Sequence, residues 1–249
     1  DQDGKVVEEW VSKKEPHVVY ALEPGEYVLH EEQVPTEQGY VRAEDVKFVV
    51  EETGDVQKVK MEDDHTKVSI SKTDITDGKE IEGAKLQILD QDGEVVESWT
   101  TGEEHLIEYL PVGTYTLHEE AAVDGYIVAN DVEFTVEETG EIQKVKMEDE
   151  RAMGQLVIVK TDTDSKAALE GVEFVLLEKE TGKEVGRLKT GKDGKAVSEL
   201  LPIGTYENGV FKEPITYVLK ETATLKGYEK TEEEWEIVFT YQNDKTPVI

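Results

Sequence analysis

Along much of the chain, apolar and polar residues alternate with a period of two, the pattern of strands that bury one face. The clearest runs cover residues 68–72, 84–89, 114–119, 132–136 and 142–149. Asp-Gly and Thr-Gly pairs between the runs indicate tight turns. No stretch carries a capped apolar stripe of helical period. About seven short strands within fewer than about 100 residues predict an all-β fold built as a Greek-key sandwich.

The strand pattern recurs because the sequence itself repeats. Residues 48–63 read FVVEETGDVQKVKMED and residues 134–149 read FTVEETGEIQKVKMED, which agree at 13 of 16 positions. A more divergent third copy carries YVLKET at residues 217–222, where the second has YTLHEE. The segments at residues 48–63 and 134–149 are 86 residues apart in the sequence, a repeat length that suits small domains that fold independently. We therefore expect three tandem domains, a first, second and third repeat at residues 1–64, 65–151 and 152–249.

A second recurring frame is L-x-P-G-x-Y or L-P-x-G-x-Y, at residues 22–27, 110–115 and 201–206. We expect it to form a tight turn followed by a strand whose tyrosine enters the core. The third repeat carries extra residues directly after this frame. This difference predicts an inserted loop or hairpin near residues 207–214.

Ionisable residues occur where the alternation predicts a buried position. In the second repeat, the inward-facing rows of the first, a middle and the last strand end on Lys72, Glu119 and Asp149. Lysine, glutamate and aspartate are almost never fully buried unless they are paired, because an isolated buried charge is costly. The third repeat shows the same pattern with Lys160, Glu221 and Asn243.

Several segments of the second repeat resemble collagen-adhesin B-type (CnaB-like) domains, also called SpaA-type pilin domains, of Gram-positive surface adhesins and pilins. They are SKTD at residues 71–74, YTLHE at 115–119, AAVDGY at 121–126 and VKMED at 145–149. The third repeat is similar to the Asn-terminated form of the family, with YQND at residues 241–244. The resemblance implies tandem Ig-like or transthyretin-like Greek-key sandwiches arranged as a rod.

In that family, a lysine on the first strand and an Asn or Asp on the last become joined by a spontaneous isopeptide bond, which a central glutamate promotes. The resemblance implies two cross-links, Lys72–Asp149 promoted by Glu119 and Lys160–Asn243 promoted by Glu221.

Physical reasoning supports this chemistry. Burial favours a neutral, nucleophilic amine, while a protonated glutamate hydrogen-bonds and polarises the target carbonyl group. The reaction occurs once per domain and leaves no free catalyst, so we do not expect an enzyme. The alternative is a buried, non-covalent network of the same residues.

The first repeat has only part of this site. Its counterpart of residues 66–89, which would carry the lysine, is missing, while Glu31 and Asp63 align with the glutamate and aspartate of the second repeat. We expect no internal cross-link here, an open sheet edge beside the last strand, and a half-site in which Glu31 is the promoting residue. Two explanations remain open. The chain is a fragment of a longer protein, which we favour, or another molecule donates the strand.

The composition narrows the classes of partner. The chain has 58 acidic and 27 basic residues and a formal net charge of −31, which argues against nucleic acid. It has no cysteine and no apolar run near the length of a membrane span. The Asp-rich segments at residues 90–93 and 162–164 are interpreted as turns, and the histidines form no ligand cluster. We therefore expect no metal and no cofactor.

Two functions fit these observations. The first, which we favour, is a stalk or spacer of an extracellular adhesin or pilus-like protein at the cell surface or cell wall, in contact with other surface-protein subunits. The second is a ligand-binding module that recognises a host matrix protein such as collagen. The near-identity of the first two repeats favours a spacer, since a recognition surface needs no duplicate. The insertion makes the third repeat the best candidate for a specific contact.

Overall fold

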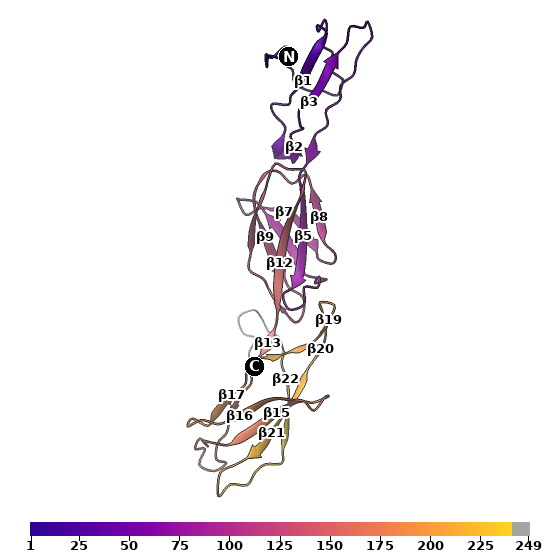
Figure 1. Cartoon of the computed structure of the whole chain (residues 1–249). Helices are drawn as coiled ribbons and strands as arrows, with labels where there is room; N and C mark the ends of the chain where they lie inside the picture. Colours follow the sequence, from indigo (N-terminus) through magenta and orange to yellow (C-terminus); the bar gives the residue numbers. More distant parts are fainter. Residues whose placement is uncertain (241–249) are drawn as a thin grey trace. The chain divides into compact units, whose positions relative to one another are not determined.

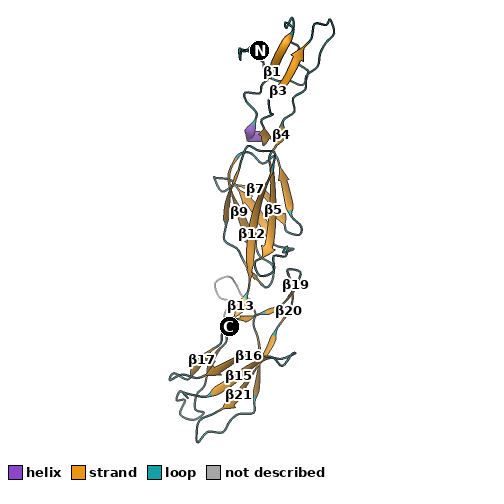
Figure 2. Cartoon of the chain, viewed as in Figure 1, coloured by secondary structure: helices purple, strands orange, loops and turns teal. Residues whose placement is uncertain are grey.

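The structure, a computed structural model, describes residues 1–240 of the chain. Strands and their connecting turns dominate it, together with one short 3-10 helix, η1 (Thr36–Gln38) (Figure 2). The chain forms two compact units. One comprises residues 1–69, 106–114 and 135–144, and the other comprises residues 70–105, 115–134 and 145–240. The predicted all-β fold is confirmed.

The first repeat contains two short antiparallel strand pairs (Figure 1). Its strands are β1 (Gly25–Leu29), β2 (Tyr40–Val41), β3 (Val46–Val50) and β4 (Asp64–His65). β1 pairs with β3, which places Tyr27 opposite Phe48 with 5.8 Å between the ring centroids. β2 pairs with β4. Both β1 and β3 alternate half-buried and exposed residues, as the period of two predicts.

The second repeat forms two four-stranded sheets, in the orders β10-β12-β5-β8 and β11-β9-β6-β7. The strands are β5 (Lys67–Asp74), β6 (Lys85–Leu89), β7 (Val95–Thr100), β8 (His105–Glu108), β9 (Gly113–Ala121), β10 (Tyr126–Ile127), β11 (Val132–Val136) and β12 (Ile142–Arg151). The first and last strands, β5 and β12, are neighbours. Ile70, Leu86, Leu117 and Met147 are at most 2% exposed. The alternation in the sequence therefore marked the buried faces correctly.

The first repeat lacks the strand that corresponds to β12. Residues 51–63 form no strand, and the side chains of Val56 and Val59 are 82% and 40% exposed. A strand is stable only when its N–H and C=O groups find partners, and the first repeat contains no counterpart of β5. The sequence predicted an open sheet edge beside a formed last strand. Instead, the last strand itself is absent from the described first repeat.

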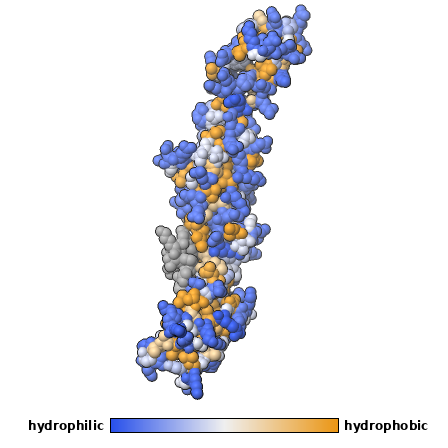
Figure 3. Space-filling model, turned by 60° about the vertical axis from the view of Figure 1, so that its left-hand side comes forward, coloured by the Kyte–Doolittle hydropathy of each residue, from blue (hydrophilic) through white to orange (hydrophobic). Residues whose placement is uncertain are grey.

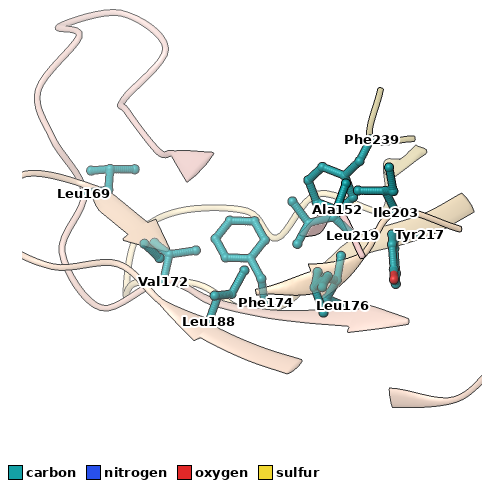
Figure 4. Close-up of a cluster of buried hydrophobic side chains, with 12 residues drawn as sticks. Ala152, Leu169, Val172, Phe174, Leu176, Leu188, Ile203, Tyr217, Leu219 and Phe239 are labelled. Atoms are coloured by element: carbon teal, nitrogen blue, oxygen red, sulfur yellow. The ribbon is translucent and has the colours of Figure 1, made fainter. Parts of the chain in front are cut away.

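The third repeat has one four-stranded sheet, in the order β16-β15-β21-β22, and three strand pairs, β13-β18, β14-β17 and β19-β20. The strands are β13 (Met153–Gly154), β14 (Val157–Val159), β15 (Glu173–Glu178), β16 (Glu184–Lys189), β17 (Lys195–Val197), β18 (Leu201–Pro202), β19 (Gly204–Glu207), β20 (Val210–Pro214), β21 (Thr216–Ala223) and β22 (Glu234–Val238). Phe174, Leu176, Leu219 and Phe239 belong to its buried core (Figure 4).

The third repeat departs from the predicted role of the tyrosine frame. Tyr115 of the second repeat is buried as expected, whereas Tyr206 is only half-buried. Tyr217, which is 2% exposed, occupies the core of the third repeat instead. The reason is the insertion, which forms the β19–β20 hairpin and puts Tyr206 on the hairpin rather than on the core strand β21.

Hydrophilic residues are spread over the visible face of the molecule, with hydrophobic residues between them (Figure 3). This distribution agrees with the high proportion of acidic residues. Within residues 1–240, no helix has the length and apolar character needed to cross a membrane.

Candidate functional site

Three ionisable side chains meet in the interior of the second repeat. Lys72 lies on β5, Glu119 on β9 and Asp149 on β12. The lysine Nζ lies 2.9 Å from Glu119 Oε2 and also contacts Asp149 Oδ1. None of the three side chains is more than 1% exposed. The three residues singled out from the sequence therefore come together in one buried cluster.

Backbone contacts hold each member of the cluster. The N–H of Ala129 donates to Glu119 Oε2 at 2.6 Å. The carbonyl oxygen of Asp149 accepts a hydrogen bond from the N–H of Ile75 at 3.0 Å, which ties the last strand to the end of β5. The N–H of Lys72 donates to the side chain of Glu80 at 3.2 Å. Main-chain groups thus hold the three residues in fixed positions relative to one another.

The environment of Asp149 favours its protonated form. The pKa of this carboxyl group is raised from 3.8 to about 7. Burial, the largest cause, and the nearby Glu119 both raise it, while Lys72 opposes the shift. Burial likewise raises the pKa of Glu80. At neutral pH, a substantial share of Asp149 would therefore be a carboxylic acid, the form that can lose its hydroxyl group as water.

Two carboxyl oxygens of the cluster lack hydrogen-bond partners among the described residues. Glu119 Oε1 and Asp149 Oδ2 are both buried and unsatisfied. A buried acceptor without a partner costs roughly 1–3 kcal/mol. A proton on Asp149 would turn one of these acceptors into a donor, in agreement with the raised pKa of this carboxyl group.

In the third repeat the structure brings together two of the three predicted residues. Lys160 Nζ donates to Glu221 Oε2 at 2.8 Å. The Glu221 side chain is fully buried, while that of Lys160 is 26% exposed. Glu221 Oε1 is buried without a partner in the described part of the chain. Asn243, the predicted acceptor, lies outside the described residues.

In the first repeat, the glutamate keeps its local geometry. Glu31 Oε2 accepts a hydrogen bond from the N–H of Ala43 at 3.1 Å, the equivalent of the contact between Ala129 and Glu119. Asp63, by contrast, is exposed and lies outside any strand. Within residues 1–240, neither carboxylate forms an ion pair with a lysine. The half-site is therefore only partly assembled.

The other polar motifs have local roles. Asp90 Oδ1 accepts the N–H groups of Asp92 and Glu94, and Asp162 caps a turn in the same way. His30 and His118 each contact an aspartate at the surface. Among residues 1–240, no group of three or more acidic or histidine side chains is arranged to hold a metal ion.

Several groups that surround the buried cluster leave no signal in the sequence pattern. Ala129 contributes only a backbone N–H, which leaves no signature in a side-chain pattern. Glu80 comes from the loop between β5 and β6, where alternation gives no guidance. Gly78 and Gly83, with φ angles of 71° and 99°, mark turns on either side of Glu80, but they do not indicate that its side chain reaches Lys72.

A comparison with protein-family models matches residues 1–65, 66–151 and 154–249 to the SpaA prealbumin-like fold domain. These matches span nearly the whole chain, so the chain belongs to this family, as the resemblance predicted. The family is structural rather than catalytic. No curated protein matches the chain.

Among solved structures, the chain is similar to the Bacillus anthracis TIE protein, with 31% identity over 89% of this chain and a TM-score of 0.55. It spans 40% of that protein's chain. A streptococcal ancillary pilin matches with 19% identity, 92% of this chain, 75% of its own and a TM-score of 0.34. The shaft pilin SpaA from Lactobacillus rhamnosus GG matches with 16% identity, 72% of this chain, 95% of its own and a TM-score of 0.32.

Proposed function

We propose that the chain is a stalk or spacer segment of a bacterial surface protein or pilus, stabilised by intramolecular isopeptide bonds. The observation that carries the proposal is the buried contact of Lys72 with Glu119 and Asp149. Membership of the SpaA domain family supports a structural role. The proposed location is extracellular, at the cell surface or cell wall, with other surface-protein subunits as partners.

The proposed reaction in the second repeat is an amide condensation. The neutral amine of Lys72 attacks the carboxyl carbon of protonated Asp149, while Glu119 hydrogen-bonds the carbonyl oxygen and relays protons. One C–N bond forms, one C–O bond breaks, and the hydroxyl group leaves as water with a proton from the amine. In the third repeat, Lys160 would attack the side-chain amide of Asn243, with Glu221 in the role of Glu119, and ammonia would leave.

Folding supplies the proximity that an enzyme would provide to two substrates. Each lysine and each acyl group is consumed, so the reaction stops after one turnover. In a tandem array, a covalent bond between the first and last strands would let tension pass through the domain without separating the strands. This is the property that a stalk requires.

A ligand-binding adhesin is the second candidate, with a host matrix protein as partner. The inserted hairpin of the third repeat was the feature that suggested it. In the structure, however, Tyr206 and Gly209 of this hairpin contact residues of the second repeat. That surface is therefore occupied within the chain, which favours the stalk.

Intact-mass spectrometry of the full chain tests the proposal. The expected mass is the sequence mass minus one water and one ammonia. Glu119→Ala should abolish the loss of water from the measured mass, and Glu221→Ala should abolish the loss of ammonia. Glu120→Ala is the matched control, because Glu120 is the exposed neighbour of Glu119 on the same strand. A wild-type chain with the unshifted sequence mass would contradict the covalent reading and leave a buried ion-pair network.

A further inference from the structure

The third repeat carries a structural element that the other two lack, the hairpin of β19 and β20. Its strands pair from Gly204 opposite Pro214 to Glu207 opposite Val210. The two turn residues, Asn208 and Gly209, have φ angles of 52° and 74°. Two successive positive φ angles match the twist of the flanking strands, so the turn is a tight and well-defined one.

The tip of this hairpin lies against residues of the second repeat, within the same compact unit. The carbonyl oxygen of Gly209 accepts a hydrogen bond from the buried hydroxyl group of Tyr126 at 2.9 Å. The approach is close, because a Cβ atom at Gly209 would lie 2.4 Å from the carbonyl oxygen of Glu80. Only a glycine fits this position.

The side of the hairpin makes a second set of contacts. The hydroxyl group of Tyr206 donates to the carbonyl oxygen of Gly125 at 2.5 Å. The Tyr206 ring meets the Tyr126 ring edge-on at 5.3 Å, and the guanidinium carbon of Arg151 lies 4.4 Å from the Tyr206 centroid. Phe211 packs so closely that a Cβ atom at Gly125 would lie 2.5 Å from its ring.

A buried ionic network supports the receiving surface. The Asp74 side chain has no exposed area and accepts hydrogen bonds from Tyr126 at 2.8 Å and from Arg151 Nε at 2.6 Å. Burial alone would raise the pKa of Asp74, but the hydrogen bonds from the Thr76 N–H, Tyr126 and Arg151 outweigh it and lower the pKa. Asp74 is thus held as an anion, which keeps Arg151 beneath the Tyr206 ring.

This network continues directly from the buried cluster of the second repeat. Asp74 follows Lys72 by two residues on β5, and Arg151 follows Asp149 by two residues on β12. Both pairs have a sequence separation of 77 residues, so they form successive contacts between the same two strands. The hairpin therefore attaches at the strand ends that lead out of the cluster.

We infer that the β19–β20 hairpin is an interdomain clamp that fastens the third repeat to the second, so that the two repeats move as one body. Its partner is the surface formed by Glu80, Gly125, Tyr126 and Arg151. The inference rests on these contacts and is independent of whether an isopeptide bond forms.

Distance measurement between two spin labels on the full chain tests the clamp. The chain has no cysteine, so Ser98→Cys in the second repeat and Lys192→Cys in the third, both at exposed positions, place the labels uniquely. The wild-type background should give one narrow distance peak. Gly209→Ala should cause loss of that peak, because the added Cβ atom collides with the Glu80 carbonyl group.

Gly182→Ala is the matched control. Gly182 has a similar φ of +67° in a turn of the same repeat, but a Cβ atom there meets nothing within 4 Å. It should keep the narrow peak. Tyr126→Phe, which removes one hydroxyl group from the second repeat, should broaden the distribution and decides the matter if Gly209→Ala fails to fold. A broad wild-type distribution, or a narrow peak in a folded Gly209→Ala chain and in Tyr126→Phe, would overturn the clamp.

Discussion

Lys72 and Asp149 have a sequence separation of 77 residues, yet the amine nitrogen of Lys72 contacts a carboxyl oxygen of Asp149 in the interior of the second repeat. As a simple ion pair, such a contact barely repays the cost of removing both charges from water. An amide bond between the two groups abolishes both charges. The covalent reading therefore explains why a sandwich keeps three ionisable side chains on its buried faces.

Replacing Asp149 by asparagine gives a sharp test of this reading. In Asp149→Asn, Lys72 would attack a side-chain amide, and ammonia would leave in place of water. The acyl group that remains is the same, so the mature variant should have the same mass as the mature wild-type chain. High-resolution intact-mass spectrometry checks this.

The matched variant is Asp149→Ala, which has no acyl group for Lys72 to attack. The mass of this variant should show no loss of water or ammonia from the second repeat. The covalent reading of this repeat fails if Asp149→Asn also retains the mass of its unreacted sequence while the chain is folded.

Loss of the cross-link should lower the stability of the second repeat considerably. In the chain-entropy model, closing a loop of 77 residues stabilises a domain by about 4.5 kcal/mol. Lys72→Ala should therefore lower the melting temperature of this repeat by more than about ten degrees. Differential scanning calorimetry of the two chains measures the shift.

Lys146→Ala is the control for that measurement, since Lys146 is an exposed lysine on β12 that pairs with the surface residue Glu148. It should melt close to the wild-type chain. Equal melting of Lys72→Ala and the wild type would show that the contact contributes nothing to thermal stability.

A chain that cannot form the bond should show an unusual dependence of stability on pH. The pKa of Asp149 is raised by burial from 3.8 to about 7, so the folded state binds this proton more tightly than the unfolded state does. The stabilisation is fully present below about pH 4 and is lost progressively as the pH rises from about 4 through about 7. Lys72 lowers the pKa of Asp149, so removing its charge in Lys72→Met should raise that pKa further. The loss of stability should then extend to higher pH.

Denaturant titration of Lys72→Met across this range measures the effect. The double variant Lys72→Met/Asp149→Asn removes the titrating carboxyl group and should lack that component of the slope. The difference between the two variants isolates Asp149 from the other acidic residues. A difference that stays constant between pH 4 and pH 8 would mean that Asp149 is not protonated in the folded state.

The composition of the buried cluster could be predicted from the sequence for a simple physical reason. A period of two assigns each residue of a strand to one face, so Lys72 and Asp149 had to share the face of their apolar neighbours. Buried ionisable groups need a polar partner, and Glu119 was the ionisable residue at an inward-facing position of the central strand. The same reasoning predicted that Lys160 and Glu221 meet in the third repeat, where they form a hydrogen bond.

The contacts made by loops could not be predicted in this way. The Ala129 N–H that orients Glu119 depends on the path of a loop, and so does Glu80 beside Lys72. The predicted position of Tyr206 was wrong. The frame that ends at Tyr206 matches the other repeats, but the hairpin that contains this residue turns it away from the core strand. Alternation describes the faces of strands, but it carries no information on where an insertion will dock.

The first repeat should be able to accept a first strand supplied as a peptide. Glu31 already makes the backbone contact that Glu119 makes in the second repeat. The segment that ends at Asp63 is nearly identical to the one that forms β12, but it has no strand beside it. A peptide that copies residues 66–89 would supply that strand and a lysine. We expect it to become covalently attached to the first repeat with loss of one water, which mass spectrometry after denaturation would detect.

Two controls identify the linkage. A peptide in which the residue copied from Lys72 is alanine should not attach, and neither should the unchanged peptide attach to Asp63→Ala. The peptide could also compete for the second repeat, so the adduct must be mapped by digestion to the segment that contains Asp63. Absence of any adduct, together with unchanged behaviour of Asp63→Ala, would mean that Glu31 and Asp63 do not form a competent half-site. In that case the similarity of Glu31 to Glu119 ends at the backbone hydrogen bond.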